Sequence, residues 1–506
     1  MHTPKFKTWR RAVLTFMFGS MIQTTFAASI DVSPNDNLPE VIARAQAGDT
    51  LKLASGTYKT KLLIDKPITI EGPADRSAKI EGDRTGRTIS VTAPDVTLRN
   101  LTVTRSGMSL PAMDAGIYLE ETAPRALIEH NNILDNSVGV YIHGSAESMV
   151  RENKIVGDAT LRVNERGNAV TVWNAPGAQV IGNDISKGRD GIFSNTSKNN
   201  TYKNNRFSDL RFAVHYMYTN DSEVSDNISV GNNMGYVLMF SDRLKVHGNI
   251  AVGSRDQGIM LNYVNYSEIN DNIINKAGKC VFAYNANYNK IVANHFENCE
   301  IGIHFTAAIE GTSLSDNAFI NNESQVKYVS TRFLDWGEGG RGNYWSDNSA
   351  FDLDGDGFGD SAYRPNGIID QIVWRAPVAR LLMNSPAISI VKWAQSQFPA
   401  ILPGGVIDSK PLMKAGSNKT TTKYEAMKEQ LFARSQNPSV RMERCRKRLI
   451  ELSGTGKHVP QGRLKSFQTT LTPPAARFCP SLPYQRASAA NTVQPATQAT
   501  VKDINP

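Results

Sequence analysis

The stretch from about Leu127 to Tyr328 alternates apolar and polar positions with unusual regularity. A Gly, Ala or Cys precedes an apolar-x-apolar triplet at a nearly constant interval. The eight occurrences are Gly139-Val-Tyr-Ile, Ala169-Val-Thr-Val, Gly191-Ile-Phe-Ser, Ala213-Val-His-Tyr, Gly235-Tyr-Val-Leu, Gly258-Ile-Met-Leu, Cys280-Val-Phe-Ala and Gly302-Ile-His-Phe. Alternation with period two, rich in Val, Ile, Phe and Tyr, predicts short β-strands rather than helices.

An asparagine recurs at the same interval. Steps of 22 or 23 residues, with a single step of 30, separate Asn131, Asn153, Asn183, Asn205, Asn227, Asn249, Asn272, Asn294 and Asn317. A period of this length is typical of a solenoid, an array or a propeller. A 22-residue unit without a helical pattern has room for two or three short strands. We therefore predict an all-β fold, a right-handed parallel β-helix with coils of about 22 residues.

The asparagine column carries two further expectations. Coils of a β-helix stack at the inter-strand spacing of roughly 4.8 Å, so equivalent side chains lie above one another. Stacked asparagines are then placed to hydrogen-bond along the column. Each asparagine also fits a tight turn in which its own backbone visits the left-handed region, which this residue tolerates.

Composition and periodicity divide the chain into five segments. A short helix at 37–46 is expected to cap the first open edge, and one or two helices, broken at Pro386, are expected at 378–398. The segments are a signal peptide at 1–27, an N-terminal cap with irregular first coils at 28–125, regular repeats at 126–330, a C-terminal cap with an Asp/Gly-rich loop and a helix at 331–413, and a basic, partly helical and partly disordered tail at 414–506 with helical patches at 424–433 and 441–452.

The first residues predict export. Basic residues at 5–11 precede a short apolar run, and Thr25-Phe26-Ala27 supplies small residues for cleavage before Ala28. An uncleaved membrane anchor is the alternative, but Gly19, Ser20 and Gln23 interrupt the run. We therefore expect a soluble, exported protein.

The net charge of +8 conceals two regions of opposite sign. The residues from Pro411 onward contribute +11 and the signal region +4, which leaves −7 for the body. A mildly acidic solenoid is not a typical nucleic-acid binder. The basic tail suits a membrane surface or an acidic partner.

Four cysteines are expected in an oxidising compartment. Cys280 and Cys299 would be near neighbours across one rung, so either a disulfide or two buried thiols fits. Cys445 and Cys479 could pair within the tail. No Cys-x-x-Cys occurs in the sequence, which argues against a thiolate zinc site.

An outward stripe follows the repeated small residue, two and four places after it. On three adjacent rungs this stripe carries His215, Met217, Met239 and Met260. Imidazole and thioether are soft ligands that favour Cu(I) over Mg²⁺ or Ca²⁺, so we consider these four residues a candidate copper site. The alternative is a partly exposed apolar groove where another chain docks, or packing under the inserts.

A second candidate metal site is Asp352, Asp354, Asp356 and Asp360. The Asp-x-Asp-x-Asp-Gly start matches a calcium loop, but the twelfth position is Tyr363 rather than Glu. Structural calcium and a hydrogen-bonded Asp/Gly turn both fit this pattern.

Polysaccharide chemistry is the main enzymatic alternative for a β-helix. A hydrolase needs paired carboxylates on one face, and a lyase or epimerase needs a general base beside cations. The outward stripe offers aromatic, His and Met side chains instead, and Glu120 and Asp190 stand isolated. A carbohydrate-binding or carbohydrate-modifying protein therefore remains the rival hypothesis.

Motifs near the end of the repeats resemble those of a known family. They are Gly342-Asn-Tyr-Trp-Ser-Asp, Asp352-Leu-Asp-Gly-Asp-Gly-Phe-Gly-Asp, Tyr363-Arg-Pro, Arg380-Leu-Leu-Met-Asn-Ser-Pro-Ala and Asp408-Ser-Lys-Pro-Leu-Met. Over about residues 28–414 the chain resembles the NosD family, whose members are periplasmic accessory proteins of nitrous oxide reductase maturation. The resemblance implies a non-enzymatic role in copper-site assembly. The implied partners are the membrane and ATPase subunits of an ABC transporter, the reductase and a copper chaperone. The resemblance supplies no ligand set, and the tail extends beyond it.

Overall fold

The computed structural model describes residues 27–306, 309–329, 332–365, 376, 378, 382, 385–397, 405–417 and 419–435. The chain divides into two compact units, Met1–Gln436 and Asn437–Pro506, and the described residues all belong to the first. The signal region before Ala27, the expected helix at 441–452, Cys445 and Cys479 lie outside the described residues.

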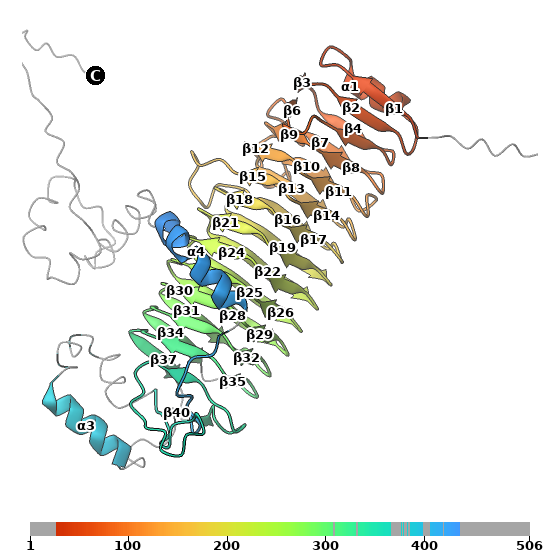
Figure 1. Ribbon diagram of the computed structural model, residues 1–506. Helices are drawn as coiled ribbons and strands as arrows, with labels where there is room; N and C mark the ends of the chain where they lie inside the picture. Colours follow the sequence, from red (N-terminus) through yellow and green to blue (C-terminus); the bar gives the residue numbers. More distant parts are fainter. Residues whose placement is uncertain are drawn as a thin grey trace, which may run out of the picture. The chain divides into compact units, whose positions relative to one another are not determined.

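Three parallel sheets run through the described repeats, and each coil contributes one strand to each sheet (Figure 1). Sheet A consists of β1 (Ser29–Val32), β2 (Thr50–Leu53), β5 (Thr69–Glu71), β8 (Thr97–Arg99), β11 (Leu127–Glu129), β14 (Met149–Arg151), β17 (Gln179–Ile181), β20 (Thr201–Lys203), β23 (Glu223–Ser225), β26 (Lys245–His247), β29 (Glu268–Asn270), β32 (Lys290–Val292) and β35 (Ser313–Ser315).

Sheets B and C are built in the same way. Sheet B consists of β3 (Gly56–Lys59), β6 (Ala78–Glu81), β9 (Leu101–Thr104), β12 (Asn132–Leu134), β15 (Lys154–Val156), β18 (Asp184–Ser186), β21 (Arg206–Ser208), β24 (Ile228–Val230), β27 (Ile250–Val252), β30 (Ile273–Asn275), β33 (His295–Glu297), β36 (Ala318–Ile320) and β39 (Tyr344–Trp345). Sheet C consists of β4 (Leu62–Ile64), β7 (Ile89–Val91), β10 (Ala115–Leu119), β13 (Val138–His143), β16 (Val170–Trp173), β19 (Asp190–Lys198), β22 (Phe212–Asn220), β25 (Met234–Asp242), β28 (Gln257–Asn265), β31 (Lys279–Tyr284), β34 (Ile301–Thr306) and β37 (Ser324–Val329).

The parallel β-helix predicted from the repeat is therefore confirmed. Its interior is a set of apolar stacks, because every strand directs alternate residues inward. The middle residues of the sheet A strands form one such stack and are almost fully buried: Leu51, Ile70, Leu98, Ile128, Val150, Val180, Tyr202, Val224, Val246, Ile269, Ile291 and Leu314.

The asparagine column forms a continuous buried ladder. In each step, the Oδ1 of one asparagine accepts hydrogen bonds from the backbone N and the Nδ2 of the asparagine one coil earlier, as for Asn205 and Asn227 at 2.9 and 3.0 Å. The same pair of bonds recurs from Asn131 to Asn343. The predicted hydrogen bonding along the column is confirmed.

The expectation that these asparagines adopt the left-handed conformation is wrong. The residue with positive φ stands one place earlier in each coil, as in Asn204 (φ 56°), Asp226 (φ 55°) and Asp271 (φ 55°). The asparagine itself turns inward, because its amide must satisfy buried backbone groups.

A buried carboxylate closes the ladder at its C-terminal end. Asp408 Oδ2 accepts hydrogen bonds from the backbone N of Asn343 (2.7 Å) and from Trp345 Nε1 (2.8 Å). Burial raises the pKa of Asp408, although these hydrogen bonds oppose the shift. A Cβ on Gly342 would lie 1.8 Å from Asp408 Oδ1, so this position requires glycine. The terminal motifs therefore meet as one cap.

The remaining described elements frame the coils. Helix α1 (Leu38–Arg44) buries Leu38 and Ile42 at the N-terminal end, where a capping helix was predicted. Helix α3 (Pro386–Gln397) begins at the proline expected to break the helical pattern, and β38 (Phe333–Asp335) pairs with β40 (Gly405–Ile407). Cys280 and Cys299 form a disulfide, both fully buried.

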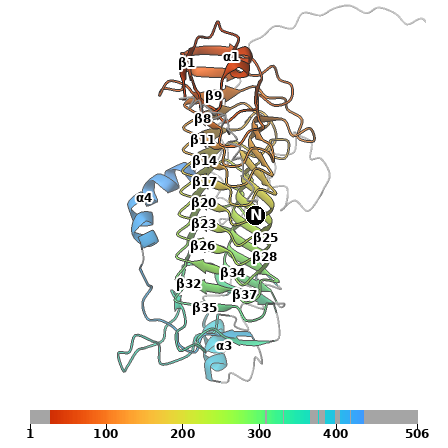
Figure 2. The same cartoon turned by 90° about the vertical axis from the view of Figure 1, so that its right-hand side faces the viewer.

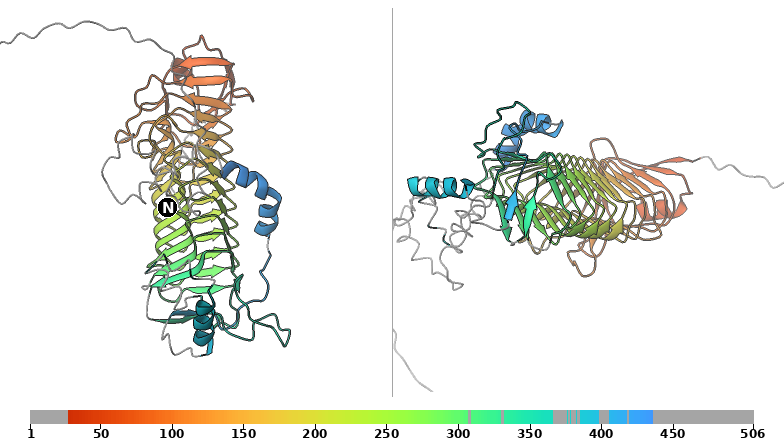
Figure 3. Two further views of the ribbon diagram at one scale, coloured as in Figure 1. Left: turned by 90° about the vertical axis from the view of Figure 1, so that its left-hand side faces the viewer. Right: turned by 90° about the horizontal axis from the view of Figure 1, so that it is seen from below.

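Helix α4 (Lys419–Ser435) packs on the outer face of sheet B (Figures 2 and 3). Tyr424 and Leu431 are buried against an apolar patch that consists of Ile228, Val230, Ile250, Val252 and Ile273. The Nδ2 of Asn275 donates a hydrogen bond to the Tyr424 hydroxyl at 2.8 Å. Among the described helices, none is long and apolar enough to cross a membrane.

Candidate functional site

Two columns of side chains face outward from sheet C, in the register that the repeat predicts. The His215 column comprises Tyr118, Tyr141, Thr171, Phe193, His215, Val237, Met260, Phe282, His304 and Lys327. The Met217 column, two residues further along each strand, comprises His143, Trp173, Asn195, Met217, Met239, Asn262 and Tyr284.

Three of the four predicted copper ligands, His215, Met217 and Met239, stand at neighbouring positions of the two columns. Met217 pairs directly with Met239 on the next strand, and His215 precedes Met217 by two residues on the same face. Met260 belongs to the His215 column two coils after His215, with Val237 between them. By strand geometry Met260 lies diagonal to Met239, with the two Cα atoms roughly 8 Å apart.

His215 is oriented by the carboxylate of Asp190, a residue that stands isolated in the sequence. Asp190 is fully buried, and its Oδ2 lies 3.1 Å from His215 Nδ1. Arg211 Nε and Nη2 donate to the two oxygens of Asp190 at 2.8 and 2.6 Å. Burial raises the pKa of Asp190, but the hydrogen bonds from His215 and Arg211 outweigh it and leave the pKa below its usual value. The carboxylate is therefore ionised at neutral pH.

The contact with Asp190 uses Nδ1 of His215, so the other ring nitrogen, Nε2, takes no part in it. No residue among those described makes a hydrogen bond to it. A histidine that binds metal through one nitrogen commonly donates its other N–H to a carboxylate, which fixes the tautomer and raises the basicity of the ligand. Nε2 of His215 is therefore a candidate donor on the same outward face as the Met217 and Met239 thioethers.

Aromatic rings line the edge of this group, and those of Tyr218 and Tyr263 are exposed. Tyr218, Phe240 and Tyr263 follow directly after Met217, Met239 and Asn262, and successive rings stack with centroids 5.2 Å apart. All three have positive φ, between 50° and 53°. The same corner position holds Gly144, Asn174, Thr196 and Asn285 on flanking coils, residues better suited to this conformation, Thr196 excepted. The outward strand positions alone did not predict this aromatic edge, because the three rings stand at the corner residue that follows them.

The carboxylates near this face do not form a hydrolytic pair. Glu120 pairs with Arg87 at 2.5 Å, and Asp190 pairs with Arg211 and His215. The two columns as defined contain no Asp or Glu. The residues of these two columns therefore do not supply the paired carboxylates that glycoside hydrolysis uses.

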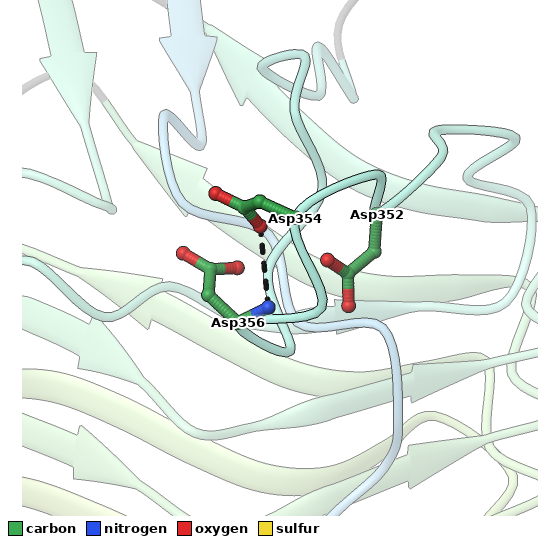
Figure 4. A group of neighbouring side chains, drawn as sticks. All are labelled: Asp352, Asp354 and Asp356. Atoms are coloured by element: carbon green, nitrogen blue, oxygen red, sulfur yellow. Dashed lines mark hydrogen bonds between the residues drawn. The ribbon is translucent and has the colours of Figure 1, made fainter.

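The aspartate-rich loop brings three of its four predicted ligands together (Figure 4). Carboxylate oxygens of Asp352, Asp354 and Asp356 lie within 4.8 Å of one another. Asp352 also accepts hydrogen bonds from the backbone N of Gly355 (2.7 Å) and of Gly357 (3.0 Å). Asp360 stands outside the group and accepts from the backbone N of Leu353 (2.9 Å). The geometry fits a calcium loop and an Asp/Gly turn alike.

Comparisons with known proteins point to one family. The family model described as "Periplasmic copper-binding protein (NosD)" matches residues 151–350, which include the His215, Met217, Met239 and Met260 positions. The "Probable ABC transporter binding protein NosD" of Stutzerimonas stutzeri is 38% identical over 389 residues, which are 74% of this chain and 89% of that protein. The protein of the same description from Pseudomonas aeruginosa PAO1 is 37% identical over 401 residues, 76% of this chain and 92% of that protein.

Solved structures show a more distant similarity. PfbA, a surface adhesin of Streptococcus pneumoniae, is 11% identical, with 56% of this chain and 87% of that chain covered and a TM-score of 0.45. Such a similarity says nothing about what this chain binds. The two relatives, by contrast, are matched over almost their whole length at more than 35% identity. The chain therefore belongs to the NosD family.

Proposed function

We propose that this chain is a non-enzymatic periplasmic protein that carries Cu(I) transiently during the maturation of nitrous oxide reductase. It works with the membrane and ATPase subunits of an ABC transporter and receives copper from a chaperone. The description of the matching family as periplasmic and copper-binding supports the cargo, and the naming of the two relatives as probable ABC transporter binding proteins supports the partner. The resemblance of the terminal motifs supports the reductase as the destination.

The observation that carries the proposal is the group formed by His215, Met217 and Met239. Strand pairing places Met217 and Met239 side by side, His215 stands two positions before Met217 on the same outward face, and Asp190 orients its imidazole. Met260 on the next coil is a further soft donor that copper can reach as it moves along the face. Thioether and imidazole donors suit Cu(I), which is the copper species expected to be transferred.

The location of the group fits a carrier better than a permanent copper centre. Met217, Met239 and Met260 are all partly exposed, on an outward sheet face rather than in an enclosed cavity. Copper on this face remains open to attack by the ligands of another protein. Transfer between proteins requires such access, whereas a resident cofactor is usually enclosed.

The test is Cu(I) competition titration against a chromophoric chelator, with the full chain. We expect Met217→Leu/Met239→Leu to weaken Cu(I) binding at least tenfold, because leucine keeps the volume and removes sulfur. The matched control is Met108→Leu/Met413→Leu, which removes two partly exposed thioethers elsewhere and leaves the affinity unchanged. Equal Cu(I) affinity of wild type and the Met217/Met239 variant would contradict the assignment.

A further inference from the structure

The C-terminal end of the same outward face has a different chemistry. His304 lies four coils after His215 in the His215 column, on β34. Strand pairing places Lys327 of β37 directly beside it and Phe282 of β31 on its other side, with the Phe282 and His304 ring centroids 5.1 Å apart. The Nζ of Lys279 lies 5.3 Å from the centroid of the Phe282 ring. The strands on either side of His304 therefore each carry a lysine, Lys279 on β31 and Lys327 on β37.

The two lysines form no ion pair with another described residue, whereas His215 pairs with Asp190. Burial, together with the charges of Lys327 and Lys279, lowers the pKa of His304 to about 4. The imidazole is therefore neutral at neutral pH, in a region of positive potential.

Two polar atoms at this end also lack a partner. His304 Nδ1 and Thr306 Oγ1 are buried and make no hydrogen bond in the described structure. Thr306 follows His304 by two residues, so both side chains face the same way. Since buried polar atoms are usually satisfied, these two atoms offer hydrogen-bonding capacity to a ligand that binds beside the lysines.

We propose that this end of sheet C, formed by Lys279, His304, Thr306 and Lys327, is a docking site for an acidic segment of a partner protein. Carboxylates of the segment pair with the two lysines, and the imidazole N–H and the threonine hydroxyl donate hydrogen bonds to it. The site goes beyond the proposed copper function and does not depend on it.

A segment with several carboxylates fits better than a free anion. Lys279 and Lys327 stand two coils apart, roughly 10 Å along the stack, which one small ion spans poorly. The residues lie on an open sheet face beside the rings of Phe282 and Tyr284, the latter 42% exposed. Aromatic rings next to cations suit a peptide that brings both apolar and charged groups.

The test uses fluorescein-labelled hexaglutamate as the acidic probe and the full chain. In fluorescence anisotropy we expect Lys279→Gln/Lys327→Gln to weaken binding at least tenfold. The control Lys245→Gln/Lys290→Gln removes the same charge from sheet A and should change binding less than twofold. Binding should also weaken as salt is added, because exposed charges are screened. Equal binding by wild type and Lys279→Gln/Lys327→Gln would overturn the proposal.

A second readout identifies the ligand at the site itself. In protein labelled with ¹⁵N-histidine, with the His304 signal assigned from His304→Asn, hexaglutamate should raise the pKa of His304 and sulfate at equal ionic strength should not. An equal response to sulfate would identify a small-anion site and overturn the acidic-segment proposal. The Cu(I) affinity of Lys279→Gln/Lys327→Gln should match that of wild type, so failure here is distinguishable from failure of the copper proposal.

Discussion

His215 and His304 occupy equivalent positions, four coils apart in one column of sheet C, yet their surroundings have opposite charge. A buried carboxylate, Asp190, holds His215, whereas Lys279 and Lys327 flank His304. The first environment favours a bound cation and the second favours an anion. A repeat therefore fixes where a side chain is, while residues from neighbouring strands decide what it can bind.

Sheets B and C of the same coils offer a second contrast. Both present apolar side chains outward, and on sheet B helix α4 covers them. On sheet C, Tyr218 and Tyr263 remain 52% and 43% exposed beside the thioethers. Outward apolar residues in a solenoid can thus serve the chain's own packing or remain available to another molecule.

We expect the largest effect from removing the Asp190 carboxylate, the charge that distinguishes the surroundings of His215 from those of His304. Asp190→Asn should weaken Cu(I) binding by about 10- to 100-fold, the usual cost of losing a carboxylate behind a metal-binding histidine. It should also lower the free energy of unfolding by about 2 kcal/mol, because Arg211 keeps a weaker acceptor. Competition titration and urea denaturation measure the two effects. Asp221→Asn, at the exposed pair with Arg243, is the control, and the idea fails if both variants bind Cu(I) like wild type.

We expect a smaller effect when His304 is given a neighbouring carboxylate, as His215 has. Lys327→Glu replaces an ammonium group beside His304 with a carboxylate. We expect the pKa of His304 to rise above its value of about 4, since the new charge stabilises the imidazolium, while burial continues to hold the pKa down. Titration of the ¹⁵N-histidine signals between pH 4 and 8 measures the shift. A pKa that stays below 5 in this variant would show that burial alone, and not the lysines, sets it.

The smallest predicted effect concerns stability against pH. Unfolded histidine binds a proton near pH 6.5 but folded His304 does so only near pH 4, so His304 should destabilise the protein progressively as the pH falls from about 6.5 to 4. His304→Asn should make the loss of unfolding free energy at low pH smaller by about 1 kcal/mol. This figure is discounted for solvent screening, because the ring is partly exposed. Urea denaturation at pH 7 and pH 4.5 gives the difference. His130→Asn is the exposed control, and identical pH dependence of wild type and His304→Asn would refute the prediction.

The sequence predicted the fold in detail because a solenoid is local. Spacing alone placed Met217 beside Met239, since each coil repeats the same strand positions. It did not reveal Asp190 as the partner of His215, because Asp190 lies 25 residues earlier and joins the site only through stacking. The spacing also predicted the left-handed conformation for the ladder asparagines such as Asn205. The structure shows this conformation at the preceding residue instead, such as Asn204.

The ends of the coil stack were harder to predict than its middle. The motifs around Gly342 and Asp408 were visible as sequence signals, but 65 residues separate Asn343 from the carboxylate that closes its ladder. Helix α4 was expected from its composition, yet nothing local indicated the patch of Ile228 and Val252 on which it packs.

The sequence by itself determined the architecture, the register and the outward placement of the soft donors, because periodicity is a property of the chain alone. Only the tertiary structure decided the charge around each donor, the closing of the asparagine ladder and which apolar face is covered. Those features depend on contacts between residues far apart in sequence, and a carboxylate or an ammonium group acts on whatever folding brings within a few ångströms.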